Sequence, residues 1–77
     1  MTGTQRNRNF LRKENGMKII FFDSKNETRT SVDNVEQIVS DYAHINGRVT
    51  KVWHLYLFDG STRAFKQKDY TIDRIEA

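Results

Sequence analysis

The stretch from Val49 to Phe65 constrains the fold most strongly, because it has the pattern of a β-hairpin. Apolar and β-branched residues flank Asp59-Gly60, a dipeptide that favours a tight type I′ turn with two positive-φ residues. In the first arm, one face carries Trp53, Leu55 and Leu57, and the other carries His54, Tyr56 and Phe58. A half-buried strand carries polar residues on its outer face. Both faces of this hairpin are therefore expected to need cover, one from the core and one from a helix, loop or partner.

A second pair of strands is predicted nearer the N-terminus. Lys18 to Asp23 contains the run Ile19-Ile20-Phe21-Phe22, which is typical of a central strand buried on both faces. The residues 23–26, Asp-Ser-Lys-Asn, favour a turn, because short Asx and Ser side chains can hydrogen-bond their own backbone. The segment 27–32 then returns as a more exposed strand, with Arg29 and Ser31 on one face.

Asp33 to Tyr42 is predicted as the helix of the domain. Asp33 and Glu36 have the spacing of a capping box. The apolar residues of the segment form one stripe at helical period: Val32, Val35, Ile38, Val39 and Tyr42. The alternative makes residues 37–44 a strand, in which Ile38, Ser40, Tyr42 and His44 alternate before an Asn46-Gly47 hairpin turn. The helix is favoured for 33–40, and a strand could begin anywhere after Val39.

The remaining segment, Tyr70 to Ile75, is predicted as a closing edge strand, although Ile72 and Ile75 are spaced as in a helix. The predicted fold is therefore α+β. It is a small β-rich domain over 17–77, with antiparallel hairpins of about four or five strands and one short helix. Residues 1–16 are expected to form a flexible basic arm ending at Gly16, and Met17 is an alternative start of the protein.

The charge of the chain is concentrated in that arm. The 77 residues have a net charge of +3. Residues 1–16 carry that charge, because Arg6, Arg8, Arg12 and Lys13 stand against one glutamate. Residues 17–77 contain nine cations and nine carboxylates. A balanced body gives little support to a nucleic-acid-binding protein, which normally has a basic surface.

The composition indicates a non-enzymatic protein. There is no cysteine, which excludes disulfides, a thiolate zinc site and a cysteine nucleophile and fits a reducing cytoplasm. No apolar run reaches the roughly 20 residues of a membrane span. The glycines do not have the spacing of a phosphate-binding loop: Gly3, Gly16, Gly47 and Gly60. The carboxylates stand singly at predicted turns and caps, so no catalytic group is expected and no cofactor is required.

One metal site has to be weighed as an alternative. Asp41 and His44 are three residues apart and would point the same way from a helical turn. His54 could arrive from the next strand as a third zinc ligand. Such a set also arises by chance, so a zinc-stabilised domain is the third interpretation of this chain.

The aromatic residues give the main functional indication. Trp53, Tyr56, Phe58, Phe65 and Tyr70 lie in or beside the hairpin. They can serve as a compact core or as an exposed face for a protein or for stacked bases. We expect a protein-binding surface that includes Trp53, Tyr56, Phe58 and Arg63, assisted by the arm cations Arg6, Arg8, Arg12 and Lys13. Arg63 is the cation expected to share the face of Tyr56. A second copy of the chain is another candidate partner, and nucleic acid bound by the arm and the aromatic face is the second interpretation.

Four segments of the chain resemble short accessory proteins of phages and prophages of Gram-positive bacteria. These are Lys-Ile-Ile-Phe-Phe-Asp at 18–23, Val-Glu-Gln-Ile at 35–38, Leu-Phe-Asp-Gly-Ser-Thr-Arg at 57–63 and Tyr-Thr-Ile-Asp-Arg-Ile at 70–75. The resemblance implies a cytoplasmic protein without catalytic machinery that occupies a surface of a host protein. Anti-CRISPR proteins, which block a CRISPR effector nuclease by stoichiometric binding, are one such class.

Overall fold

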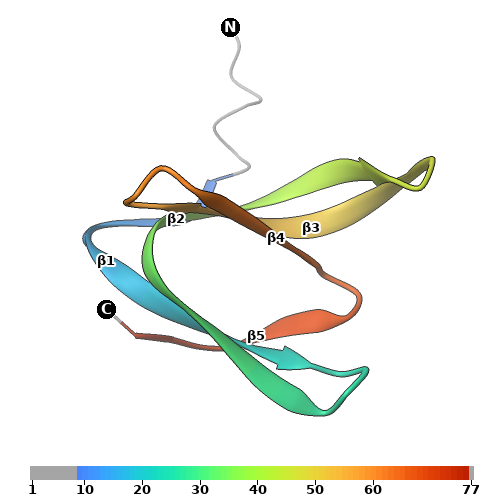
Figure 1. Cartoon of the computed structure of the whole chain (residues 1–77), viewed down its shortest axis with the longest axis horizontal. Coiled ribbons are helices and arrows are strands. Elements are labelled where there is room, and N and C mark those ends of the chain that lie inside the picture. The colour runs from blue at the N-terminus through green and yellow to red at the C-terminus, as the bar shows by residue number, and fades with distance from the viewer. Residues whose placement is uncertain (1–8, 77) are drawn as a thin grey trace, which may run out of the picture.

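The computed structural model describes residues 9–76, which form a small antiparallel β domain (Figure 1). Its strands are β1 (Asn9–Asp23), β2 (Thr28–Ile45), β3 (Arg48–Leu57), β4 (Thr62–Lys66) and β5 (Tyr70–Glu76). They form one five-stranded sheet in the order β4-β3-β2-β1-β5. The prediction of a small β-rich domain built from antiparallel hairpins is confirmed.

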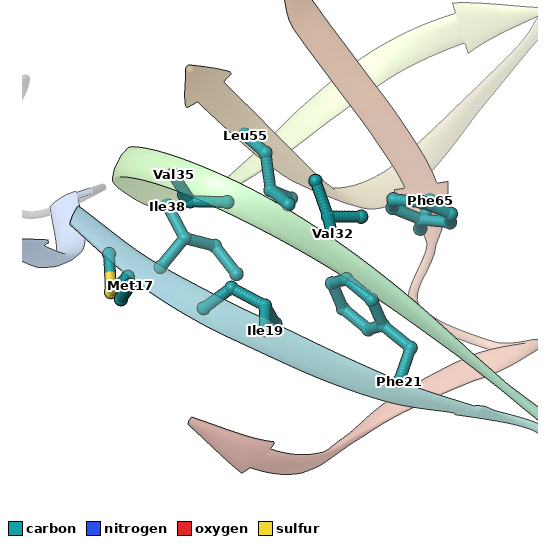
Figure 2. Close-up of a cluster of buried hydrophobic side chains, with 8 residues drawn as sticks. All are labelled: Met17, Ile19, Phe21, Val32, Val35, Ile38, Leu55 and Phe65. Atoms are coloured by element: carbon teal, nitrogen blue, oxygen red, sulfur yellow. The ribbon is translucent and has the colours of Figure 1, made fainter. Parts of the chain in front are cut away.

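The sheet folds over on itself because β2 is long and sharply bent. Its first half pairs with β1, in the layer that also holds β5, and its second half crosses to pair with β3, in the layer that also holds β4 (Figure 1). The hydrophobic core fills the space between the layers. Ile19 and Phe21 reach it from β1, and Ile38, Leu55 and Phe65 reach it from the opposite layer (Figure 2).

The helix predicted over 33–42 is wrong, and no helix occurs among residues 9–76. Two β-bulges in β2 explain the helical period of its apolar residues. Against β1, the step from Met17 to Ile19 lies opposite the longer step from Val35 to Val32 in β2. Against β3, the step from Val35 to Gln37 in β2 lies opposite the single step from Leu57 to Tyr56. Each bulge inserts one extra residue, so successive inward side chains stand three apart instead of two. Val32, Val35 and Ile38 are therefore all buried in one strand.

The same device accounts for the ambiguous C-terminal segment. Strand β5 is the predicted edge strand, but it pairs with β1 and not with the central hairpin. The single step from Ile20 to Phe21 in β1 lies opposite two steps in β5, from Arg74 to Ile72, so β5 contains one extra residue. The extra residue places Ile72 and Ile75, three apart, against the same core.

The two predicted hairpin turns differ in type. Asn46-Gly47 joins β2 to β3 with φ values of 53° and 77°, as the predicted tight turn requires. At Asp59-Gly60 the positive φ is confined to Gly60, at 91°. The Gly60 N–H donates to the Leu57 carbonyl at 3.1 Å, and the Leu57 N–H donates to the Ser61 carbonyl at 3.0 Å. This connection is the three-residue type with glycine at its end, so the type I′ prediction is wrong there.

The domain begins before the predicted boundary at Gly16. Strand β1 starts at Asn9 and already pairs with β2 through Arg12, opposite Gln37. The next pair in register is Met17 with Val35, so residues 13–16 bulge out of the ladder. Gly16 has φ 83°, a conformation that side-chain-bearing residues adopt at a cost. Residues 9–16 of the expected arm thus belong to β1, and residues 1–8 lie outside the described part.

The N-terminal apolar run is buried on one face and not on both. Ile19 and Phe21 are fully buried. Ile20 and Phe22 point the other way and are half-buried. The Arg29 guanidinium lies 5.6 Å from the centroid of the Phe22 ring, which covers part of that outer side. The prediction that this central strand is buried on both faces is therefore only half correct.

Candidate binding surface

Strand register assembles one continuous outer face across four strands. Arg12 pairs with Gln37, Gln37 with Tyr56, and Tyr56 with Thr62. Directly opposite residues of an antiparallel pair present their side chains on the same side of the sheet. A second row runs through Val39, His54 and Ala64. The outer face is defined here by Arg12, Gln37, Val39, His54, Tyr56, Thr62 and Ala64.

Two parallel rings occupy the middle of the outer face. The rings of His54 and Tyr56 have centroids 4.6 Å apart and planes 9° from parallel. Alternation along β3 puts both on the side opposite Leu55, which is fully buried. Tyr56 retains 37% of its surface exposed, and the neighbouring Phe58 retains 47%. The predicted alternation of the first hairpin arm is confirmed, and Tyr56 on its second face remains partly exposed.

Two buried valines lie beside these rings on the same face of the sheet. Val39, opposite His54 in register, is 8% exposed, and Val52 is 2% exposed. Neither belongs to the central core cluster. The accessible apolar area of the outer face therefore comes from its aromatic rings, and the two valines are already buried within the domain.

Trp53 and Arg63 do not lie on the outer face. Trp53 packs against the core, and its indole N–H donates to the Tyr70 carbonyl at 3.2 Å. Arg63 pairs with Leu55 and therefore points to the inner side, where its guanidinium lies 5.2 Å from the centroid of the Phe65 ring. The prediction that Arg63 shares the face of Tyr56 is wrong, since strand pairing was unknown from sequence.

The remaining aromatic residues of the predicted cluster belong to the core. Phe65 is 8% exposed, and its ring centroid lies 4.6 Å from that of Phe21 and 5.0 Å from that of Tyr70. The edge-on contact with Tyr70 is a favourable arrangement for aromatic pairs. Of the residues predicted for the surface, Tyr56 and Arg12 therefore share the outer face, with Gln37 between them, and Phe58 is exposed at the β3–β4 turn.

The predicted arm cations contribute one described side chain to this surface. The guanidinium of Arg12 lies 3.1 Å from a carboxylate oxygen of Glu36 on β2, which offsets its charge. Arg6 and Arg8 fall outside the described residues. Lys13 lies within β1, but its side chain is also outside the described set.

The alternative zinc site is not assembled. On a strand, residues three apart point to opposite faces, so Asp41 and His44 diverge. Asp41 pairs with Val52, and His54, two residues further along β3, points to the same side as Val52. Asp41 and His54 therefore share one face of the sheet, and His44 lies on the other. Over residues 9–76, no group of three His, Cys, Asp or Glu side chains is placed to hold a metal ion.

The two carboxylates with shifted pKa values serve turns. Burial raises the pKa of Asp23, but hydrogen bonds from the Asn26 side chain and from the backbone of Asn26 and Lys25 more than offset this, and the net pKa is lowered. The pKa of Asp59 is lowered by hydrogen bonds from the hydroxyl and the N–H of Ser61. Both carboxylates hold a reversing backbone, as predicted for the carboxylates at turns.

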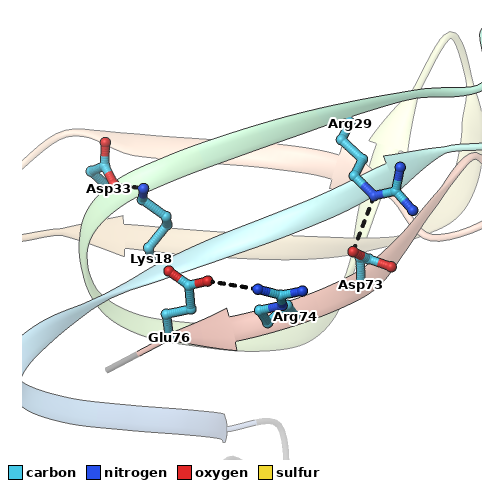
Figure 3. Close-up of polar contacts among 6 residues, drawn as sticks. All are labelled: Lys18, Arg29, Asp33, Asp73, Arg74 and Glu76. Atoms are coloured by element: carbon cyan, nitrogen blue, oxygen red, sulfur yellow. Dashed lines mark hydrogen bonds and ion pairs between the residues drawn. The ribbon is translucent and has the colours of Figure 1, made fainter.

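The structure separates the charges that cancel in the sequence. Residues 48–68, which form β3, β4 and the adjoining turns, contain five cations and one carboxylate, a net charge of +4. The rest of 17–76 contains four cations and eight carboxylates, a net charge of −4. Three of its cations form ion pairs, Lys18 with Asp33, Arg29 with Asp73, and Arg74 with Glu76 (Figure 3). The balanced net charge therefore conceals one basic and one acidic side.

The most exposed apolar residues lie at a site that the sequence analysis missed. Tyr42 is 63% exposed and Val49 is 62% exposed, near the end of the β2–β3 ribbon that projects from the sheet (Figure 1). The helical stripe predicts a buried Tyr42, which the exposed position contradicts. The strand alternative over 37–44 was the signal that could have placed it on a ribbon.

Together these features define a small antiparallel β domain with an aromatic outer face and a basic projecting ribbon. No model of a known protein family, no curated protein and no solved structure matches the chain. In the part that the structure describes, no helix is long and apolar enough to cross a membrane.

Proposed function

We propose that this chain is a non-enzymatic protein-binding module that binds its partner through the outer face. The observation that carries the proposal is the stacked and half-exposed pair of His54 and Tyr56 at the centre of that face. Tyrosine is enriched at the energetic centres of protein interfaces, because it buries a large rigid ring and keeps a hydroxyl for hydrogen bonding.

The surroundings of this pair support a protein as the partner. Gln37 and Thr62 flank Tyr56 in its row, and both side chains are polar and uncharged. Arg12, at the end of the row, is already paired with Glu36. An uncharged aromatic centre with a polar rim is the usual composition of an interface between proteins. A polyanion would require unpaired cations at this place.

The resemblance to phage accessory proteins favours a host protein as the partner. In this proposal the chain acts as a stoichiometric inhibitor that covers a functional surface of that host protein. A CRISPR effector nuclease is the partner class that the resemblance names. Mimicry of DNA by an acidic inhibitor surface does not fit the outer face, whose centre carries no carboxylate.

The experiment compares two tyrosine variants. Tyr56→Ala removes the centre of the outer face, whereas Tyr42→Ala removes an exposed tyrosine on the opposite side of the same sheet. Each tagged variant and the wild type are used to capture proteins from host-cell extract. The captured protein is then purified and its affinity is measured by calorimetry. We expect Tyr56→Ala to weaken binding at least about 30-fold, a loss typical of an interface hot spot, and Tyr42→Ala to leave it unchanged.

Inhibition is tested in the same way. If the captured protein is a nuclease, its cleavage of DNA should stop at about one inhibitor per enzyme with the wild type and with Tyr42→Ala. Equal binding by the wild type and Tyr56→Ala would overturn the proposal. A wild-type dimer that Tyr56→Ala converts to monomers would instead assign the outer face to a second copy of this chain.

A further inference from the structure

A second site lies at the edge of the β2–β3 ribbon, where β3 extends beyond the end of β4. A concavity of about 270 Å³ opens there between β3 and the β4–β5 turn. Its lining residues are Arg48, Val49, Thr50, Lys51 and Lys68. Three of these five side chains are cationic, and none is acidic. This set is called the basic pocket below.

Specific hydrogen bonds hold the two walls of the basic pocket together. The ladder between β3 and β4 stops at Val52, so Arg48 to Lys51 extend beyond β4. The Gln67 N–H donates to the Lys51 carbonyl at 2.9 Å. The Gln67 side-chain amide donates to the Val52 carbonyl at 3.0 Å and to the Ser40 hydroxyl at 2.8 Å. These bonds position the β4–β5 turn, and with it Lys68, against the ribbon.

The cations of the basic pocket have no acidic partner among the described residues. Arg48, Lys51 and Lys68 take part in none of the ion pairs of residues 9–76, which join residues of β1, β2 and β5. The pocket also lies within the segment 48–68, which has a net charge of +4. Cations gathered in a concavity produce a positive potential that attracts an anion.

An exposed aromatic ring lies beside the basic pocket. Tyr42 pairs with Lys51 in the β2–β3 ladder, and His44 pairs with Val49. Because directly opposite residues share a face, Tyr42 and His44 lie on the same side of the ribbon as Lys51 and Val49. Tyr42 is 63% exposed, so much of its ring is accessible.

We propose that the basic pocket and Tyr42 bind single-stranded nucleic acid. The ammonium and guanidinium groups contact the phosphodiester backbone, and a neighbouring base stacks on the Tyr42 ring. Cationic grooves with an adjacent aromatic side chain are the usual composition of single-strand sites. A duplex fits less well, because its bases are already stacked and cannot cover Tyr42. This site is separate from the protein-binding surface proposed above and does not depend on it.

The strength of the salt dependence follows from the number of cations. Each phosphate contact to a single strand contributes about −0.7 to the slope of log K against log salt concentration. Contacts from all three pocket cations give a slope near −2. A fourfold increase in salt should therefore weaken binding about 20-fold.

Fluorescence anisotropy with a labelled oligothymidylate of about 15 nucleotides tests the proposal. The full chain is titrated at low salt and again at a fourfold higher concentration. The double variant Lys51→Gln, Lys68→Gln should bind more weakly and with a slope reduced by about 1.4, since two phosphate contacts are lost. Tyr42→Ala should weaken binding roughly 5- to 150-fold and leave the slope unchanged, because it removes stacking and no charge.

A matched variant controls for total charge. Lys18→Gln, Lys25→Gln removes the same two charges from the acidic side of the domain, where Lys18 pairs with Asp33. It should keep wild-type affinity and slope. We expect each variant to keep the fold, because Lys51 and Lys68 are both exposed and their substitution removes no described hydrogen bond of a side chain. Circular dichroism of each variant checks this.

Several results would overturn the proposal. The wild type could fail to bind the oligonucleotide at low salt, or the pocket variant could bind as the wild type does. A chain lacking residues 1–8 could lose all binding while Lys51→Gln, Lys68→Gln keeps it, which would assign the contact to Arg6 and Arg8. Equal affinity for the single strand and for a duplex of the same length would remove the role of Tyr42.

Discussion

The backbone N–H of Phe58 donates to the carbonyl oxygen of Asn34 at 3.0 Å and so ties the β3–β4 turn to the bend in β2. The Phe58 ring also lies beside Gly16, where an added β-carbon would stand 3.4 Å from Phe58 Cε2. Three segments distant in sequence therefore meet at one corner of the sheet. At the same corner β1 bulges, and β2 passes from one layer to the other.

Substitution of Gly16 should show how much this corner contributes. Gly16→Ala is expected to lower the free energy of unfolding by about 1–2 kcal/mol, because φ is 83° there. Gly47→Ala should cost a similar amount, since φ is 77° and nothing lies within 4 Å of an added β-carbon. Gly16→Val should cost clearly more than Gly47→Val, because the larger side chain meets the Phe58 ring. Urea unfolding of the four variants measures these differences. Equal costs for the two valine variants would contradict the packing of Phe58 on Gly16.

Asn34 distinguishes a bent strand from a helix. Its φ is 58°, which glycine adopts freely and proline cannot adopt. Asn34→Gly should therefore stay within about 0.5 kcal/mol of the wild type, and Asn34→Pro should cost about 3 kcal/mol or more. In a helix capped by Asp33, proline at position 34 would be well tolerated. Retained thermal stability of Asn34→Pro would thus favour the helix over the structure described.

Neighbouring residues of β3 should respond very differently to truncation. Leu55 is fully buried, so Leu55→Ala is expected to cost about 2–5 kcal/mol. Tyr56 is 37% exposed, and Tyr56→Ala should cost about 1 kcal/mol, chiefly through loss of its contact with His54. Thermal unfolding followed by Trp53 fluorescence measures both. A larger loss for Tyr56→Ala than for Leu55→Ala would show that the outer face is core.

The turn carboxylate Asp23 should make stability depend on acid. Its pKa is lowered in the folded state from the ordinary value of 3.8, so the ionised form stabilises the fold. This contribution is complete above pH 3.8 and is lost as the pH falls below that value toward the folded pKa. Asp23→Asn should be less stable than the wild type at neutral pH, and its stability should fall less steeply below pH 3.8. Urea midpoints measured across the acid range test this.

Asp59 is a second carboxylate whose ionised form should stabilise the fold. Its pKa is also lowered, and it lies in a different turn from Asp23. Asp59→Asn should remove a further part of the acid dependence, and the double variant should show the sum of the two effects, as expected for separated sites. An acid profile of Asp23→Asn that matches the wild type would show that Asp23 does not stabilise its turn through charge.

Local sequence patterns predicted much of the strand content. Alternation placed Leu55 and Tyr56 on opposite faces of the strand, and Asn46-Gly47 marked a tight hairpin turn correctly. These features depend on the period of side chains along one strand and on φ preferences of single residues. Such properties belong to a few adjacent residues, so a single sequence is enough to recognise them.

The sequence alone thus determined which segments reverse and which side chains alternate, while the tertiary structure decided how the segments meet. Bulges in β2 and β5 arise from pairing with other strands, and they convert a strand period into an apparent helical one at Val32, Val35 and Ile38. Pairing also put Arg63 beside Leu55 and gathered Arg48, Lys51 and Lys68 around one concavity. The physical reason is that register and charge placement depend on contacts between distant residues, which neither local periodicity nor a net charge contains.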